Sequence, residues 1–325
     1  MNNLPDIAAA IRRSKSLLIC GHIMPDGDCL GSVLALGLSL EAIGKKVVMA
    51  GPDPIPAIYE FLPGVARFQT GVPPAGIYDT FIVLDCSVPE RLGRDYQELL
   101  AQNMVMINID HHAGPGISGT YSYVDTTAAA VGEIIFDLLK SMQISISGET
   151  AINLYTAIVT DTGSFQYDNS TPGTHRRVAE LLELGVPGSQ INIALNEEKP
   201  KAALVLLREA LHTLTMSPCG KVCWMTVTQE MIKITGAMEE HTEGLVNYCR
   251  SVRGVEVGLL FREISEGTYK VSLRSKNIAD VNKLAAQFGG GGHPRAAGCL
   301  LKGALQEIQD KVTRATVLAT GGTAL

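Results

Sequence analysis

Apolar and polar residues alternate along the first half of the chain in a regular way. Short apolar runs typical of buried strands lie at 16–20, 46–50, 80–85 and 104–110. Longer stretches with the spacing of helices lie between them, at 5–15, 30–43, 127–142 and 150–160. Strands that alternate with helices predict an α/β fold with a mainly parallel sheet and helices on both faces.

The pattern changes after residue 184. A polar segment with a proline, 196–201, reads as a connector that enters a helix at 202–214. Further strands are expected at 221–228, 255–263 and 269–275, and a further helix at 281–288. We therefore expect a parallel-sheet domain at 1–195, a linker at 196–206 and a smaller α/β domain at 207–320.

Composition narrows the class of protein. The chain has 325 residues, 46% of them apolar and 18% charged, which suits a globular enzyme of two domains. Its formal net charge of −6 argues against a protein that grips long nucleic acid. A phosphate-bearing substrate would then be short, and metal ions would supply much of the positive charge.

Seven cysteines without a CxxC pair predict reduced core thiols rather than disulfides or a zinc site. The N-terminus lacks the order of regions that a secretion signal needs, and no apolar run approaches membrane-spanning length. We therefore expect a cytoplasmic protein.

Polar residues follow three of the predicted strands at the point where each ends. His22 follows the first strand, Asp85 ends the third, and Asp110-His111-His112 ends the fourth. Ligands of open α/β sheets bind beyond the carboxyl ends of the strands. These residues are therefore expected at one rim of the sheet.

The loop after the first strand places His22, Asp26 and Asp28 within seven residues, among glycines and a proline. Such a loop can direct several ligands towards a cation, although either acid could equally cap the next helix. Asp85, taken alone, could be an ordinary turn residue.

The adjacent histidines His111 and His112 point in different directions, so that one can bind metal while the other faces a substrate. Asp110 beside them can orient an imidazole through its second nitrogen. A solvated turn is the alternative. Asp161 ends another apolar segment, where it could equally belong to a helix-end turn.

Together these elements provide four carboxylates and two imidazoles, and the set is His22, Asp26, Asp28, Asp85, His111 and Asp161. Oxygen and nitrogen ligands without thiolates favour Mn²⁺ or Mg²⁺ over structural zinc. Four buried carboxylates would repel one another without cations. Two ions about 3.5–4 Å apart would neutralise them and clamp the oxygens of a displacement at phosphorus. Asp85 is the natural carboxylate for both ions to share.

A glycine-rich run, Gly289-Gly290-Gly291-Gly292-His293, follows the helix at 281–288. Glycines let backbone N–H groups approach a phosphate closely. His293 and an arginine such as Arg274 could add positive charge. The alternative is a flexible linker, against which the flanking helix and the following Ala-Ala-Gly argue.

These motifs, in this order, resemble the DHH/DHHA1 phosphoesterase superfamily, and within it the bifunctional oligoribonuclease and pAp phosphatase (nanoRNase) group. The resemblance covers nearly the whole chain. It implies that one metal is held by His22, Asp26 and Asp85, and the other by Asp28, Asp85, His111 and Asp161. It also implies a phosphate contact from His112 and nucleotide binding by Arg274, Ser275, Gly290, Gly291 and His293. Asp110 would support the catalytic histidines.

The resemblance further implies hydrolysis of short RNA to mononucleotides and of pAp to AMP by metal-activated water, as in a 3′–5′ oligoribonuclease and bisphosphate nucleotidase. A stand-alone phosphodiesterase for cyclic dinucleotides would use the same metal site and is the main alternative. A pyrophosphatase lacks the glycine-rich C-terminal motif, and a RecJ-type exonuclease needs more chain and a basic channel. A nucleotide-binding sensor is the alternative outside enzymes. The family also suggests a homodimer.

Overall fold

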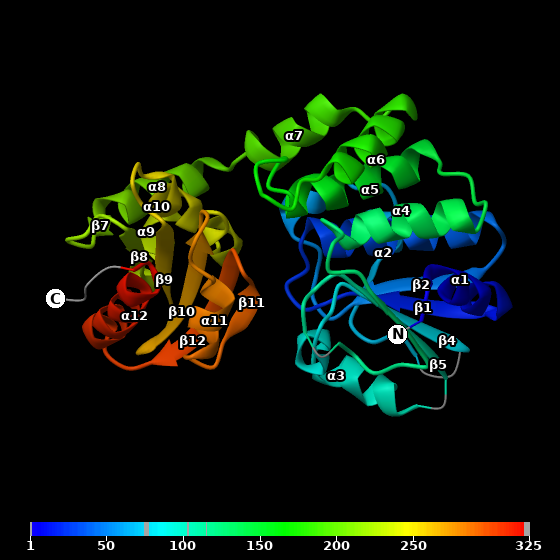
Figure 1. The fold of residues 1–325 in the computed structure, drawn as a ribbon, viewed down its shortest axis with the longest axis horizontal. Helices are drawn as coiled ribbons and strands as arrows, with labels where there is room; N and C mark the ends of the chain where they lie inside the picture. Colours follow the sequence, from blue (N-terminus) through cyan, green and yellow to red (C-terminus); the bar gives the residue numbers. More distant parts are fainter. Residues whose placement is uncertain (1, 75–77, 103, 115, 322–325) are drawn as a thin grey trace. The chain divides into compact units, whose positions relative to one another are not determined.

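The computed structural model describes residues 2–74, 78–102, 104–114 and 116–321 (Figure 1). The chain divides into two compact units, Met1–Glu198 and Lys199–Leu325. Each unit has its own six-stranded sheet. No helix in the described ranges is long and apolar enough to cross a membrane.

The sheet of the first unit is parallel throughout, in the order β3-β2-β1-β4-β5-β6. Its strands are β1 (Ser16–Cys20), β2 (Lys46–Gly51), β3 (Gln69–Thr70), β4 (Thr80–Leu84), β5 (Val105–Asp110) and β6 (Tyr121–Val124). The four predicted strands are β1, β2, β4 and β5. The strand order reverses between β1 and β4, so the carboxyl ends of β1, β4 and β5 meet at the crevice where such sheets bind ligands.

Helices cover both faces of this sheet (Figure 1). One face carries α1 (Leu4–Arg13), α2 (Gly27–Ala42), α4 (Val131–Ser141) and α5 (Gly148–Asp161), with α6 (Pro172–Glu183) and α7 (Gly188–Asn196) beyond them. The other face carries α3 (Arg94–Gln97) and its 3₁₀ neighbours η3 (Pro89–Leu92) and η4 (Glu98–Ala101). Two more 3₁₀ turns, η1 (Ala57–Tyr59) and η2 (Val65–Arg67), follow β2.

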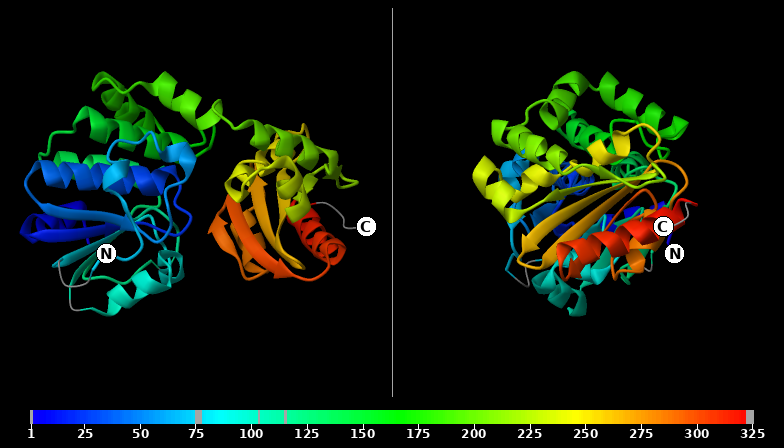
Figure 2. Two further views of the ribbon diagram at one scale, coloured as in Figure 1. Left: turned by 180° about the vertical axis from the view of Figure 1, so that it is seen from behind. Right: turned by 90° about the vertical axis from the view of Figure 1, so that its left-hand side faces the viewer.

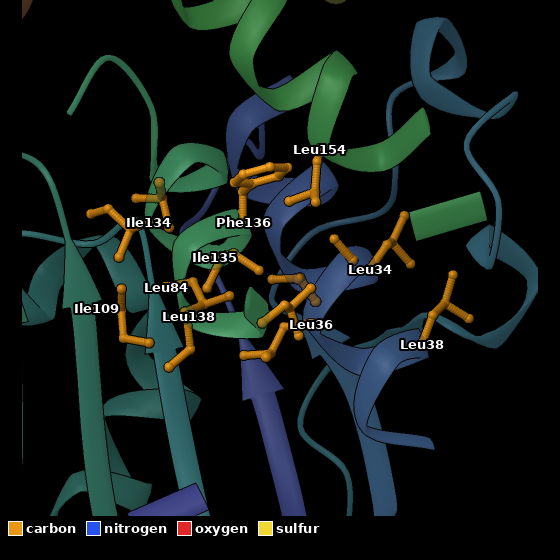
Figure 3. Close-up of a cluster of buried hydrophobic side chains, with 14 of the residues drawn as sticks. Leu34, Leu36, Leu38, Leu84, Ile109, Ile134, Ile135, Phe136, Leu138 and Leu154 are labelled. Carbon is orange, nitrogen blue, oxygen red and sulfur yellow. The ribbon is translucent and has the colours of Figure 1, made fainter. Parts of the chain in front are cut away.

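Alternate residues of each central strand explain this two-sided burial. In β1, Leu17 and Ile19 pack in the cluster of α1, α2, α4 and α5, whereas Leu18 and Cys20 pack in the cluster that contains Tyr96 of α3. Figure 3 shows the first cluster, in which Leu84 of β4 lies among side chains of α4. Strands that are apolar on both faces read as continuous apolar runs, which is why they could be recognised in the sequence.

The second unit has a mixed sheet in the order β11-β12-β10-β9-β8-β7, in which only β8 and β9 are parallel. Its strands are β7 (Thr215–Met216), β8 (Val222–Val227), β9 (Val257–Ser265), β10 (Thr268–Ser275), β11 (Gly291–His293) and β12 (Ala296–Lys302). One face packs on α8 (Lys201–His212), α9 (Gln229–Thr235) and α10 (Val246–Ser251), with η5 (Glu239–Thr242) nearby. The other packs on α11 (Val281–Ala286) and α12 (Leu305–Ala319), as Figure 2 also shows.

The α/β fold class with two sheet-containing parts is confirmed. The segment 196–206 differs from the linker that was expected there, because α8 begins at Lys201. Ala203, Leu206 and Ala210, at helical spacing, are buried, and Leu206 belongs to a core cluster of the second unit. The helix expected from residue 127 begins only at Val131, because the backbone of Ala130 before it is extended.

Candidate active site

His22 leaves the end of β1 and is 2% exposed. Its Nδ1 lies 2.7 Å from the carbonyl oxygen of Ile23, and its Nε2 faces the acids of the site. Nε2 lies 3.3 Å from Oδ2 of Asp85 and 3.9 Å from Oδ2 of Asp26. Nε2 of His22 and the carboxylates of Asp26 and Asp85 are therefore placed to bind one cation together.

Asp26 both caps a helix and faces the candidate metal site, the two alternatives that the sequence left open. Its Oδ1 caps α2 by accepting hydrogen bonds from the backbone N–H groups of Asp28 and Cys29. Its Oδ2 faces His22 instead. Helix capping thus fixes the carboxylate in the orientation that a metal ligand needs.

Asp28 lies in the first turn of α2 and is 1% exposed. The first N–H groups of α4, from Val131 and Gly132, donate to its carboxylate at 2.7 and 2.9 Å. The hydroxyl of Ser32 donates to it at 3.1 Å. The N-terminus of α4 therefore stabilises negative charge on Asp28.

Asp85 follows β4 with a φ of 57°, a left-handed conformation that side chains other than glycine adopt at a cost of about 1–2 kcal/mol. This turn places its carboxylate, 2% exposed, among the histidines. Oδ2 faces His22, and Oδ1 lies 3.6 Å from Nε2 of His111. In the part of the chain that the structure describes, Oδ1 has no hydrogen-bond donor.

The three residues of Asp110-His111-His112, at the end of β5, make different contacts. Oδ1 of Asp110 accepts from Nδ1 of His112 at 2.8 Å and from the backbone N–H groups of His111 and His112. Nδ1 of His111 donates to the carbonyl oxygen of Ala128 at 3.1 Å. The Nε2 atom of His111 then lies 3.5 Å from Oδ2 of Asp161 and 3.8 Å from Oδ2 of Asp28.

The burial of so many acids changes their protonation. Burial and the neighbouring Asp85 raise the pKa of Asp28 well above its usual range. Burial raises the pKa of Asp161 to about 7. Burial opposes protonation of His111, but Asp161, Asp28 and Asp85 outweigh it and raise its pKa to about 9. The cluster therefore attracts positive charge, which divalent cations would supply in place of protons.

The residues present fit such cations. Two groups, His22-Asp26-Asp85 and Asp28-Asp85-His111, each bring their ligand atoms within 4.8 Å of one another. Nε2 of His22 and Oδ1 of Asp85 are buried and have no hydrogen-bond partner among the described residues. Asp85 belongs to both groups, and Asp161 adjoins the second through His111.

One basic residue of this site was missed by the sequence reasoning. Arg91, in η3 after β4, places Nη2 3.0 Å from Nδ1 of His22. Among the described residues, no carboxylate lies within 4.0 Å of its guanidinium group. No periodicity marks this arginine, because η3 is too short to show one.

The glycine-rich run of the second unit is an ordered hairpin rather than a flexible linker, because Gly291–His293 pairs with β12. A Cβ atom at Gly290 would lie 2.1 Å from the carbonyl oxygen of Gly298, so only glycine fits there. Arg274 is the second-last residue of β10 and lies opposite Ala296 of β12. Ser275 is fully buried and donates to Pro294, so its hydroxyl supports the hairpin and does not face solvent.

Comparison with known proteins decides the family. The model of the DHH family, N-terminal domain, matches residues 16–160, and that of the DHHA1 domain matches residues 229–317. The chain belongs to the DHH/DHHA1 phosphoesterase superfamily. The resemblance read from the motifs is thereby confirmed. The DHH match contains His22, Asp85 and His111, and the DHHA1 match contains Arg274 and His293.

Two relatives match this chain over nearly their whole length. The bifunctional oligoribonuclease and PAP phosphatase NrnA of Thermus thermophilus is 32% identical over 93% of this chain and 92% of that protein. The probable NrnA of Streptococcus mutans is 29% identical over 92% of this chain and 93% of its own length. Among solved structures, an exopolyphosphatase-related protein from Bacteroides fragilis is similar, with a TM-score of 0.88 at 25% identity over 98% and 95% of the two chains.

Proposed function

We propose that this DHH/DHHA1 protein is a metal-dependent phosphoesterase that degrades short oligoribonucleotides to mononucleotides and dephosphorylates pAp to AMP. The observation that carries the proposal is the convergence of His22, His111 and their acidic neighbours on the two oxygens of Asp85. The substrates come from the relatives, which are named as bifunctional oligoribonucleases and PAP phosphatases.

Two metal sites would share Asp85. His22 and Asp26 complete the first, and Asp28, His111 and Asp161 complete the second. The mixture of carboxylate and imidazole ligands favours Mn²⁺, with Mg²⁺ as the other candidate. Bound divalent cations would supply Lewis acidity, which lowers the pKa of a water molecule and offsets charge on the phosphoryl oxygens.

The reaction itself is a hydrolysis without a covalent enzyme intermediate. The oxygen of water forms a bond to phosphorus, the ester bond to the leaving oxygen breaks, and that oxygen takes up a proton. His112 is held by Asp110 through Nδ1, so its Nε2 is the atom that would contact a phosphoryl oxygen. The guanidinium group of Arg91 would stabilise charge that develops on the same group.

The second unit would bind the nucleotide. We propose that the hairpin of Gly290, Gly291 and His293 and the neighbouring Arg274 hold a phosphate or base of the substrate, and that Ser275 acts through the hairpin. A guanidinium group matches the geometry of phosphate oxygens. This assigns catalysis to residues 1–195 and substrate binding to residues 207–320.

The net charge of −6 supports substrates too short to need an extended basic surface. The seven cysteines are free thiols, which is consistent with action in the reducing cytoplasm. The exclusion of long duplexes and the homodimer stay predictions.

A substrate panel tests the function. Purified protein with Mn²⁺ is incubated with a 5-mer RNA, pApA, pAp and a cyclic dinucleotide, and initial rates are compared. We expect turnover of the RNA, pApA and pAp. Rapid turnover of the cyclic compound alone would contradict the proposal, and binding of nucleotide without product would favour a sensor. An Arg274→Ala variant should raise KM, whereas Lys302→Ala, at the other end of the β10–β12 ladder, should not.

A further inference from the structure

One short segment, Ala128–Gly132, contacts several candidate ligands at once. Its first carbonyl oxygen accepts the Nδ1 proton of His111 at 3.1 Å. Its last two N–H groups donate to both carboxylate oxygens of Asp28 at 2.7 and 2.9 Å. This segment, called the 128–132 loop below, ends in the first two residues of α4. It sets the direction of a metal-binding nitrogen and of a metal-binding carboxylate.

Asn169 extends these contacts to a third ligand. Its Nδ2 donates to the carbonyl oxygens of Ala129 and Asp161, both at 3.1 Å. One side-chain amide thus ties the 128–132 loop to the end of α5, the helix whose last residue is Asp161. The two carbonyl acceptors also determine which end of the amide carries the nitrogen.

Glu133 holds the same loop from its other side. The residue is 3% exposed, and its Oε2 accepts the backbone N–H of Ala129 at 3.2 Å. Nη1 of Arg177 lies 3.7 Å from Oε2, and Arg177 also pairs with Asp137. Among the described residues, Oε1 of Glu133 has no hydrogen-bond partner.

Ala129, Ala130 and Val131 are fully buried, but the loop is not packed on every side. A cavity of about 150 Å³ lies beside it, lined by Thr127, Ala128, Glu133, Asp137 and Arg177 among others. Most residues of the loop are alanines. Ala130 is the N-cap residue of α4, and its side chain forms no capping hydrogen bond. The hydrogen bonds from Asn169 and to Glu133 therefore add a directional constraint that the packing of small side chains does not supply.

The ligands of the other metal site have different supports. Nδ1 of His22 faces the carbonyl oxygen of Ile23, and Asp26 is fixed by the N–H groups of α2. Neither contact involves the 128–132 loop. A disturbance of that loop should therefore affect one site and spare the other.

We propose that Asn169 and Glu133 are positioning residues that preorganise the metal site of Asp28, His111 and Asp161 through the 128–132 loop. The inference rests on the proposed two-metal function. It adds that the two metal sites are held in place by different parts of the structure. One site is built from a helix cap and a strand end, and the other depends on a loop with two side-chain anchors. Loss of an outer partner of this kind typically weakens metal binding about 10–100-fold.

The test is Mn²⁺ binding by the full-length protein, followed by calorimetry and by electron paramagnetic resonance. Wild type should bind two ions and show a spin-coupled pair at two equivalents. Asn169→Ala and Glu133→Ala should each weaken one site about 10–100-fold, keep the other and lose the coupled signal at low Mn²⁺. Glu133→Gln keeps an acceptor for Ala129 and should restore most of the loss. Asn196→Ala, on α7, is the matched control and should behave as wild type.

The outcomes separate the two claims. A wild type that binds no Mn²⁺ pair would contradict the proposed function itself. A wild type with two ions, together with variants whose two affinities are unchanged or equally reduced, would overturn the positioning role. If Asn169→Ala lacks the circular dichroism of the folded protein, the comparison of Glu133→Ala with Glu133→Gln decides.

Discussion

Nε2 of His22 and Oδ2 of Asp85 lie 3.3 Å apart, although the two residues come from the ends of different strands. The other oxygen of Asp85 faces His111 at 3.6 Å. The carboxylate of Asp85, whose backbone is left-handed, thus belongs to both candidate metal sites, that of His22 and that of His111.

Mn²⁺ binding should strengthen as the pH rises from 6 to 9. In the metal-free protein the pKa of Asp161 is raised to about 7 by burial, and the pKa of His111 to about 9 by its carboxylate neighbours. Both groups must lose a proton to bind a cation, so binding releases protons. Calorimetry at pH 7.5 in buffers of different ionisation enthalpy should show this release, and an enthalpy that is independent of the buffer would contradict it.

The same groups predict that the metal-free protein loses stability as the pH rises. The folded-state pKa of His111 lies above the unfolded value of about 6.5, so its contribution is full below that value and is lost towards pH 9. The raised pKa of Asp161 acts in the same direction. Thermal melting of protein treated with chelator should show a lower Tm at pH 9 than at pH 6.5, and saturating Mn²⁺ should reduce the difference.

Asp110→Asn should lower kcat without removing the metals. The change weakens the hydrogen bond that orients His112 towards a phosphoryl oxygen, and loss of one such donor typically costs about 10²–10³-fold in rate. His112→Ala should show a similar loss. Both variants should keep two Mn²⁺ per chain by calorimetry, and a loss of metal in either would show that the pair serves binding rather than the reaction.

Arg91→Ala should reduce kcat/KM for pAp about 10²-fold, the scale of one lost electrostatic donor. Its guanidinium group lies at the ring of His22 and has no carboxylate within 4.0 Å among the described residues. Arg94→Ala, three residues further along and exposed, is the control. Equal activity of the two variants would exclude Arg91 from substrate binding.

Glu256→Ala should destabilise the second unit by about 1–3 kcal/mol, because three backbone N–H groups would lose their acceptor. Asn277, Ile278 and Ala279 donate to one oxygen of Glu256 at 2.6–3.0 Å. The only tryptophan, Trp224 of β8, reports unfolding of this unit by fluorescence. Glu266→Ala, in the exposed turn between β9 and β10, is a control for the loss of one acid, and equal stability of the two variants would contradict the anchor role.

The pH dependence of that effect has a definite sign. Burial opposes ionisation of Glu256, but the three N–H donors and Arg295 lower its pKa below the usual value. Such a carboxyl contributes stability above its unfolded pKa of about 4.3 and loses it as the pH falls through the folded value. The difference between wild type and Glu256→Ala should therefore shrink at acid pH.

The sequence predicted the central strands and the rim of the site because those segments are apolar on both faces and end in acids or histidines. It did not reveal β11, since Gly291 and Gly292 have little strand propensity and are held by pairing with β12. Apart from Asp110, which was expected to orient an imidazole, it did not reveal the supports of the ligands. Asn169 lies in a turn and Arg91 in the short η3, and their importance depends on contacts across long sequence distances.

Phosphate release from pAp by Asp85→Ala with saturating Mn²⁺ tests the central claim most directly. Asp85 touches both metal groups, so its loss should lower kcat/KM by about 10³-fold or more, and Mn²⁺ binding should no longer reach two ions per chain. Asp95→Ala, an exposed acid of α3, should retain full activity. Full phosphatase activity in Asp85→Ala would contradict a reaction that depends on two ions sharing this carboxylate.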